Sequence, residues 1–130
     1  MADKLAELTP ELRRKVAAIL LDLKGHGYEA KVASGLRTVA EQRVLVAQGR
    51  SKTLASKHLP GPDGLSRAAD IVDAKLGWGA SRAFWLLLGS SATAHGLRWG
   101  GTFGVDAPVV DIVAGDAEMG FDPAHVELVG

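Results

Sequence analysis

The chain has 130 residues, 47% hydrophobic and 23% charged, which is enough for one hydrophobic core and is ordinary for a globular domain. Lys plus Arg equals Asp plus Glu at 15 each, so the formal net charge is zero, and this argues against nucleic-acid binding through phosphate attraction. No apolar run is long enough to cross a bilayer, and the N-terminus lacks the apolar segment of a secretory signal. We therefore expect a protein made in the cytoplasm without membrane insertion.

The first half of the chain predicts two helices separated by a strand. Thr9 is the expected N-cap of the first helix and Pro10 its first residue, and a Gly-His-Gly sequence ends it. Residues 28–34 are expected to form a short strand. Thr38 and Glu41 then match a capping box that opens a helix running to residue 48.

The second half begins with a polar loop rich in Gly, Pro and Ser at 50–66, followed by a buried strand at 67–73. Residues 80–95 form a strongly apolar helix, and the chain after residue 101 is expected to be strand and loop, with an alternating strand at 125–128. Strands that follow one another late in the chain favour an antiparallel sheet with helices at one side. The prediction is an α+β fold: one domain over 1–130, with a small antiparallel sheet and about three helices.

Four residues in two separated stretches are the types found in a hydrolytic zinc site. These are His58 and Asp70 in the first stretch, and Asp122 and His125 in the second. Two imidazoles and one carboxylate would leave a tetrahedral zinc ion with one open position for water. Asp122, three residues before His125, is placed to accept a proton from that water. The chain has no cysteine, so a closed thiolate zinc site is excluded.

Each of these residues also has a simpler structural explanation. Asp70 at the end of a strand can accept backbone hydrogen bonds. Asp122 beside Pro123 can build an Asx turn, which would leave His125 as an ordinary surface histidine. Spacing alone does not decide between these readings and a metal site.

Two further histidines compete as ligands. His26 lies between glycines just past a helix, and His95 ends a helix, where an imidazolium interacts favourably with the helix dipole. Both therefore have good structural explanations, so we favour His58 and His125.

Arg37 is predicted to lie between a strand and the N-terminus of a helix, where a guanidinium and free N–H groups can hold an anion. The alternative is a structural ion pair with Glu41 or Asp70. Both explanations remain open at this point.

Several motifs, taken together and in this order, resemble the zinc D-Ala-D-Ala carboxypeptidase and L-Ala-D-Glu endopeptidase family, which includes phage endolysins and bacterial wall-editing enzymes. The resemblance covers roughly residues 30 to 128. It rests on Ser34–Thr38 with Glu41-Gln42, on Ala47–Arg50, on Ser56, His58, Gly64 and Ala68–Ile71, on Gly96–Gly101, and on Asp122–Glu127. The segments 59–67 and 102–121 are longer than is usual in the family.

The resemblance implies a hedgehog/DD-peptidase-like fold and a role for each matched residue. Under it, His58, Asp70 and His125 are zinc ligands, Asp122 is the catalytic base, Arg37 holds a substrate carboxylate and stabilises the oxyanion, and Ser56 and Trp99 contact substrate.

The implied function is a zinc metallopeptidase that hydrolyses an amide in the peptide stem of peptidoglycan. The Trp99-Gly100-Gly101 turn favours an endolysin-like L-Ala-D-Glu endopeptidase. The alternatives are a D-Ala-D-Ala carboxypeptidase or dipeptidase and, from another class, a non-catalytic binding or phage structural module. We expect a monomer without a separate wall-binding domain, which reaches the cell wall or periplasm after release by another factor.

Overall fold

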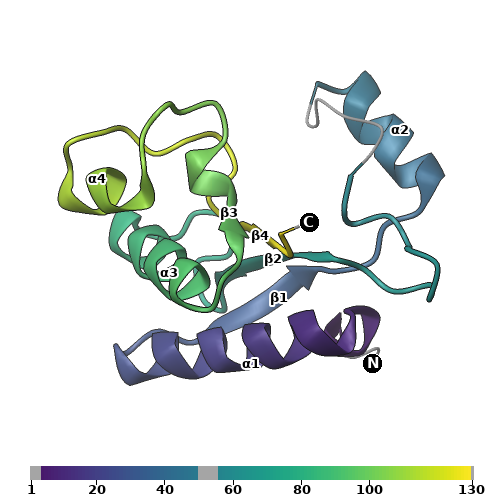
Figure 1. Cartoon of the computed structure of the whole chain (residues 1–130), viewed down its shortest axis with the longest axis horizontal. Coiled ribbons are helices and arrows are strands. Elements are labelled where there is room, and N and C mark those ends of the chain that lie inside the picture. The colour runs from purple at the N-terminus through teal and green to yellow at the C-terminus, as the bar shows by residue number, and fades with distance from the viewer. Residues whose placement is uncertain (1–3, 50–55, 130) are drawn as a thin grey trace.

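A computed structural model describes residues 4–49 and 56–129 (Figure 1). Arg50, at the end of one motif, lies outside the described residues. The elements are two 3-10 helices, η1 (Lys4–Glu7) and η2 (Gly100–Thr102); the helices α1 (Pro10–Gly25), α2 (Val39–Ala47), α3 (Arg82–Ala94) and α4 (Val109–Ala114); and the strands β1 (Ala30–Ser34), β2 (Ala68–Asp73), β3 (Arg98–Trp99) and β4 (His125–Glu127).

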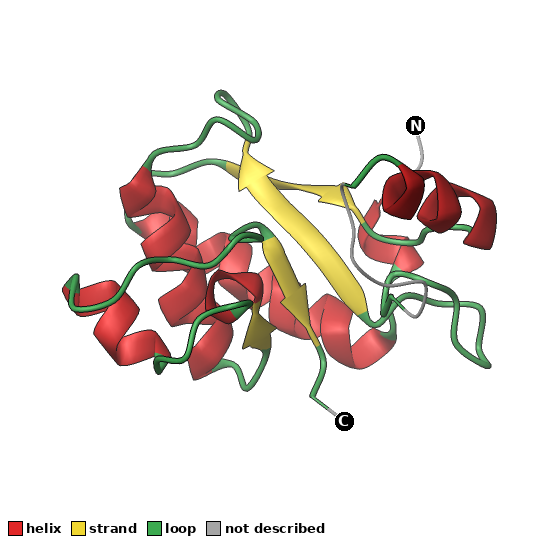
Figure 2. Ribbon diagram, turned by 90° about the horizontal axis from the view of Figure 1, so that it is seen from above, coloured by secondary structure: helices red, strands yellow, loops and turns green. Residues whose placement is uncertain are grey.

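The strands form one antiparallel sheet in the order β1-β2-β4-β3, so the predicted α+β fold with an antiparallel sheet is confirmed (Figure 2). β2 and β4 are neighbours although more than fifty residues separate them in the chain. Their register sets Asp70 directly opposite His125. The sheet therefore joins the two stretches in which the sequence analysis found its zinc-site residues.

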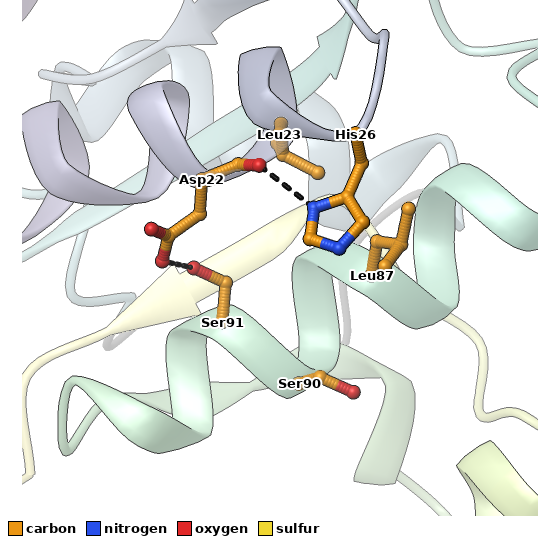
Figure 3. Close-up of a pocket in the computed structure, with 6 residues that line it drawn as sticks. All are labelled: Asp22, Leu23, His26, Leu87, Ser90 and Ser91. Carbon is orange, nitrogen blue, oxygen red and sulfur yellow. Dashed lines mark hydrogen bonds between the residues drawn. The ribbon is translucent and has the colours of Figure 1, made fainter.

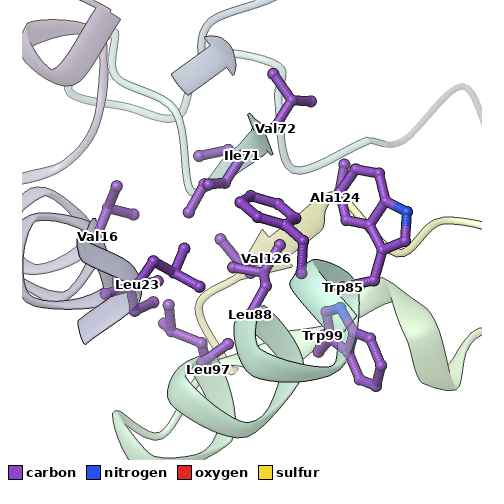
Figure 4. Packing of buried hydrophobic residues seen from close by; sticks show 14 of the residues in the cluster. Val16, Leu23, Ile71, Val72, Trp85, Leu88, Leu97, Trp99, Ala124 and Val126 are labelled. Atoms are coloured by element: carbon purple, nitrogen blue, oxygen red, sulfur yellow. The ribbon is translucent and has the colours of Figure 1, made fainter. Parts of the chain in front are cut away.

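The two faces of β2 and β4 have different chemistry. Ala69, Ile71 and Val126 belong to the hydrophobic core, to which α1 and α3 contribute buried residues (Figure 4). Alternate side chains of a strand point to opposite faces. Asp70 and His125 therefore point away from the core, on the other face of the sheet, where a polar site can form.

The predicted helix starts are confirmed. The hydroxyl of Thr9 accepts a hydrogen bond from the backbone N–H of Leu12, and Pro10 is the first helical residue. Thr38 and Glu41 form both hydrogen bonds of a capping box. This box fixes the start of α2 one residue after Arg37. In the views of Figures 1 and 2, α2 lies at the opposite end of the molecule from α3 and α4.

The segment after residue 101 differs from the prediction of strand and loop, because it contains η2 and α4. The Val-Val-Asp-Ile-Val-Ala sequence of α4 is rich in β-branched residues, which favour strands. Tertiary packing overrides this preference, since Ile112 is fully buried in the core, and Gly115 ends the helix with a φ of 86°. The described residues therefore contain four α-helices, where about three were expected.

Among the described helices, none combines the length and the apolar character needed to span a membrane.

Candidate metal centre

Three side chains from separate elements meet on the polar face of the sheet. His58 comes from the loop before β2, Asp70 from the middle of β2 and His125 from the start of β4. His58 Nε2 lies 3.4 Å from Asp70 Oδ2, and His125 Nδ1 lies 3.6 Å from Asp70 Oδ1. One ligand atom from each residue lies within 4.8 Å of the others, and all three residues are buried. The three residues predicted as ligands are thus brought together in a geometry that can hold a metal ion.

The imidazole of His58 is oriented by the backbone. Its Nδ1 lies 2.7 Å from the carbonyl oxygen of Gly35, so this nitrogen carries the proton and donates. The ring is 2% exposed, and Nε2 is a buried nitrogen without a hydrogen bond. An unsatisfied buried polar atom typically costs about 1–3 kcal/mol. A metal ion beside Asp70 would use this lone pair, and the donor set of two imidazoles and a carboxylate suits zinc.

His125 is oriented by a carboxylate. Its Nε2 lies 2.7 Å from Glu127 Oε1, and this contact turns Nδ1 toward Asp70 and Asp122. The other oxygen of Glu127 lies 3.0 Å from Lys57 Nζ. Glu127 lies in the last of the matched motifs, and neither Glu127 nor Lys57 was among the predicted site residues. The alternation of β4, which sets residues 125 and 127 on one face, is the sequence signal that points to Glu127.

The ionisable side chains of the group shift one another's pKa values. Burial disfavours ionised Asp70, but the contacts with His125 and His58 outweigh it and hold the pKa of this carboxyl well below its usual range. Burial also disfavours a protonated His125, yet Asp70 and Glu127 raise its pKa to about 9. Despite burial, hydrogen bonds from His125 and Lys57 lower the pKa of Glu127 to about 2. Asp70 therefore stays ionised, and its carboxylate is available to bind a cation.

Asp122 lies at the edge of this group, with Oδ2 3.8 Å from His125 Nδ1 and a side chain that is 38% exposed. Burial, together with the negative charge of Asp70, raises its pKa. A carboxylate of raised pKa, next to the candidate ligands and open to solvent, is suited to accept and return a proton.

The turn that carries Asp122 is shaped by the Trp-Gly-Gly sequence. The indole N–H of Trp99 donates to the carbonyl oxygen of Pro123 at 2.7 Å. A Cβ on Gly100 would lie 1.9 Å from the carbonyl oxygen of Asp122, so only glycine allows this approach. The motif thus has a structural explanation, because it sets the position of Asp122 and His125.

Trp99 does not occupy the position expected of a substrate contact. Its side chain is 1% exposed and lies in the core, where Gly89 of α3 leaves space for the ring. The prediction that the Trp99 side chain binds substrate does not fit this burial. The indole instead holds the turn before His125 through its hydrogen bond to the carbonyl oxygen of Pro123.

Arg37 lies beside the candidate metal centre, where its side chain approaches Asp70. Its Nη1 donates to Gln42 Oε1 at 2.6 Å, and its Nη2 lies 3.8 Å from Asp70 Oδ2. The sequence left open an ion pair of Arg37 with either Glu41 or Asp70. The structure shows the pair with Asp70, and Glu41 takes part in the capping box of α2 instead. The side chain is 17% exposed, so part of it is open to a ligand. Ser56 lies close to the loop ligand, and its hydroxyl accepts from the N–H of His58 at 3.2 Å.

Both competing histidines contact Asp22 of α1 instead of Asp70, and Figure 3 shows His26 beside Asp22. His26 Nδ1 lies 2.9 Å from the backbone oxygen of Asp22, and His95 Nε2 lies 3.2 Å from its carboxylate, which also accepts from Ser91. The contacts of Asp22 with Ser91 and His95 join α1 to α3, whereas the contact with His26 is local to the end of α1. Within residues 4–49 and 56–129, His58, Asp70 and His125 form the group placed to hold a metal, and neither competitor is in it.

The model of the phage L-alanyl-D-glutamate peptidase family matches residues 1–129. The chain belongs to this family. The sequence-based resemblance is confirmed, and with it the prediction that the protein is an enzyme of the peptidoglycan peptidase class. No curated protein sequence matches the chain.

Solved structures agree with this membership at the level of fold. ChiX, an L-Ala D-Glu endopeptidase of Serratia marcescens, is 24% identical in sequence, with a TM-score of 0.65. The match covers 97% of this chain and 84% of the ChiX chain. VanYB in complex with D-alanine-D-alanine is 19% identical with a TM-score of 0.59, covering 95% and 72%. A vancomycin-resistance D,D-pentapeptidase VanY in complex with Zn(II) is 20% identical with a TM-score of 0.57, covering 95% and 73%.

Proposed function

We propose that this protein is a zinc endopeptidase that cuts the bond between L-Ala and D-Glu in the peptide stem of bacterial peptidoglycan. The observation that carries the proposal is the buried His58–Asp70–His125 group, with an unpaired imidazole nitrogen facing a carboxylate, in a chain of the L-alanyl-D-glutamate peptidase family. The Zn(II) complex of the VanY neighbour supports zinc as the metal.

His58 Nε2, one carboxylate oxygen of Asp70 and His125 Nδ1 would hold the metal. Bound there, zinc supplies a Lewis acid that activates water and polarises the scissile carbonyl. The remaining ring nitrogens donate to Gly35 and Glu127, which fixes the tautomer that each histidine needs in order to bind a metal.

Asp122 is the proposed general base. As water attacks the amide carbon, its carboxylate takes the proton, and it then delivers that proton to the leaving amine of the D-Glu side. Its position beside His125 and its raised pKa support this role.

Arg37 is the proposed clamp for a carboxylate of the stem peptide, because its partly exposed guanidinium offers a planar pair of donors near the reacting centre. There it would also stabilise the negative oxygen that develops on the attacked carbonyl. Ser56 supports the loop at His58 and is placed to hydrogen-bond substrate.

The second candidate within the same chemistry is a D-Ala-D-Ala carboxypeptidase or dipeptidase. The likeness to VanYB, whose structure contains D-alanine-D-alanine, favours it. The peptide stem lies in the cell wall, so we propose that the endopeptidase acts there after release. We also propose that it is a monomer.

Mass spectrometry of fragments released from purified peptidoglycan tests the proposal. We expect fragments that begin with D-Glu, formed only when zinc is present, and formed far more slowly by an Asp122→Asn control. Release of single D-Ala residues would favour the carboxypeptidase. Absence of any cleavage by the zinc-loaded protein would leave the non-catalytic module as the correct reading.

A further inference from the structure

We propose that Lys57 and Glu127 act as a positioning pair that fixes the loop ligand and the strand ligand relative to each other before a metal binds. The inference rests on the proposed function, since it concerns how the same site is built. Neither residue would contact metal or substrate. Both would act through His58 and His125.

The Glu127 carboxylate uses its two oxygens for two different partners. Oε1 accepts from His125 Nε2 at 2.7 Å, and Oε2 lies 3.0 Å from Lys57 Nζ. The side chain of Glu127 is 9% exposed, so water has little access to replace either partner. A carboxylate held at both oxygens cannot rotate freely. The imidazole of His125 is therefore fixed with Nδ1 toward Asp70.

Lys57 connects this carboxylate to the other ligand, because it precedes His58 in the chain. Its Nζ bonds both Glu127 and the carbonyl oxygen of Leu128 at 2.6 Å, just past the end of β4. Its own carbonyl accepts from the N–H of Arg67, whose carbonyl accepts from the N–H of Leu128. The loop before β2 is thus joined to β4 by the side chain of Lys57 and by a backbone strip through Arg67.

A continuous path of contacts thus connects the two proposed histidine ligands. It runs from His58 through the peptide bond to Lys57, then to Glu127 and to His125. The rings of His58 and His125 stand 5.1 Å apart between centroids. Ordering a loop costs conformational entropy. A pair that orders it in the metal-free protein raises metal affinity, because less ordering remains to be done on binding.

The test is the dissociation constant for zinc, measured by chelator competition on the full chain. We expect Glu127→Ala to weaken binding by roughly 10–100-fold, the usual cost of losing a residue that orients a ligand. Lys57→Met should weaken it by less. If Lys57 acts through Glu127, the double variant should bind no more weakly than Glu127→Ala alone.

Asp22→Ala is the matched control, since it also removes a carboxylate in contact with a histidine, but one outside the metal group. It should lower the melting temperature and leave the zinc dissociation constant unchanged. Equal weakening by Asp22→Ala would show a general effect of lost stability and would overturn the inference.

Glu127→Gln keeps the shape of the side chain if the alanine variant does not fold. Lys57 would draw the amide oxygen, leaving the amide NH₂ toward His125, so weaker zinc binding is again expected. Wild-type affinity in this variant overturns the inference. Zinc binding by wild type without cleavage of peptidoglycan would overturn the proposed function alone, whereas no zinc binding by wild type would overturn both.

Discussion

The two histidines of the candidate centre present different ring nitrogens to the same space. His58 offers Nε2 because Gly35 occupies Nδ1, and His125 offers Nδ1 because Glu127 occupies Nε2. Each assignment follows from one hydrogen bond outside the group. A residue list taken from sequence contains both histidines but not this difference, which depends on a backbone carbonyl and on a side chain two residues along β4.

Asp122→Asn separates chemistry from metal binding. Asparagine is nearly isosteric but cannot take up a proton as a carboxylate does, so we expect turnover to fall by roughly 10²-fold or more. Zinc content and melting temperature should stay near wild type, and metal analysis with a turnover assay checks both. Loss of zinc would instead make Asp122 a ligand, and full activity would move the base to another acid.

Arg37→Lys tests the proposed clamp against a structural ion pair with Asp70. Lysine keeps the charge but lacks the planar fork, so cleavage of intact stem peptide should fall while zinc content and melting temperature stay close to wild type. A stem peptide amidated at the recognised carboxylate should then be cut about equally by both proteins. Normal activity per folded molecule in a destabilised variant would exclude Arg37 from the site.

The raised pKa of His125 predicts the pH dependence of the metal-free protein. The folded value of about 9 lies above the ordinary 6.5, so protonated His125 stabilises the fold fully below pH 6.5, and this stabilisation is lost as pH rises toward 9. With chelator present, the melting temperature should fall over that window. His125→Gln should remove this part of the slope, and an unchanged slope in that variant would contradict the assignment.

At the scale of elements, the sequence predicted correctly the helix starts that depend on hydrogen bonds between residues close together in the chain. The N-cap of α1 and the capping box of α2 depend on residues three apart, and both form as expected. α4 was missed because its β-branched sequence is helical only through burial of Ile112 in the core. The burial of Trp99 was missed for a related reason, since the space for its ring is provided by Gly89 on another helix.

Gly100→Ala tests whether the Trp-Gly-Gly turn positions the turn that carries Asp122, the proposed base. A Cβ at this position would lie 1.9 Å from the backbone oxygen of Asp122 and 2.9 Å from the Cβ of His125, so backbone must move. We expect destabilisation of roughly 1–3 kcal/mol, as for overpacking. Activity per folded molecule should also fall, because Asp122 is displaced.

Gly25→Ala is the control for that variant, since nothing lies within 4 Å of the added Cβ at the end of α1. Its activity should equal that of wild type. Melting curves and turnover measured on the same preparations distinguish the two variants. Normal activity of Gly100→Ala would mean that the turn tolerates the shift.

At the scale of the whole molecule, the site depends on contacts that no short stretch of sequence specifies. β2 and β4 pair across more than fifty residues, and only their register sets Asp70 opposite His125. Spacing left the metal reading undecided against simpler explanations. The resemblance of motifs, in order along nearly the whole chain, is what pointed to the ligands. The alternation of β4 was a signal for the contact of Glu127 with His125, but the contacts of Gly35 and Lys57 could be seen only in the folded structure.

Removal of the metal should therefore affect the stability of the whole domain. The proposed ligands come from a loop and two strands, and an ion that binds only the folded state stabilises it. Free zinc at 100 times its dissociation constant adds about 2.7 kcal/mol. For a domain of this size, 1 kcal/mol corresponds to roughly 4 °C, so excess zinc should raise the melting temperature of the chelated protein by about 10 °C.

The variant His58→Ala/His125→Ala should melt at one temperature with zinc or with chelator, while His26→Ala and His95→Ala should keep the full difference. A zinc-dependent shift that survives the loss of both His58 and His125 would place the metal elsewhere in the molecule.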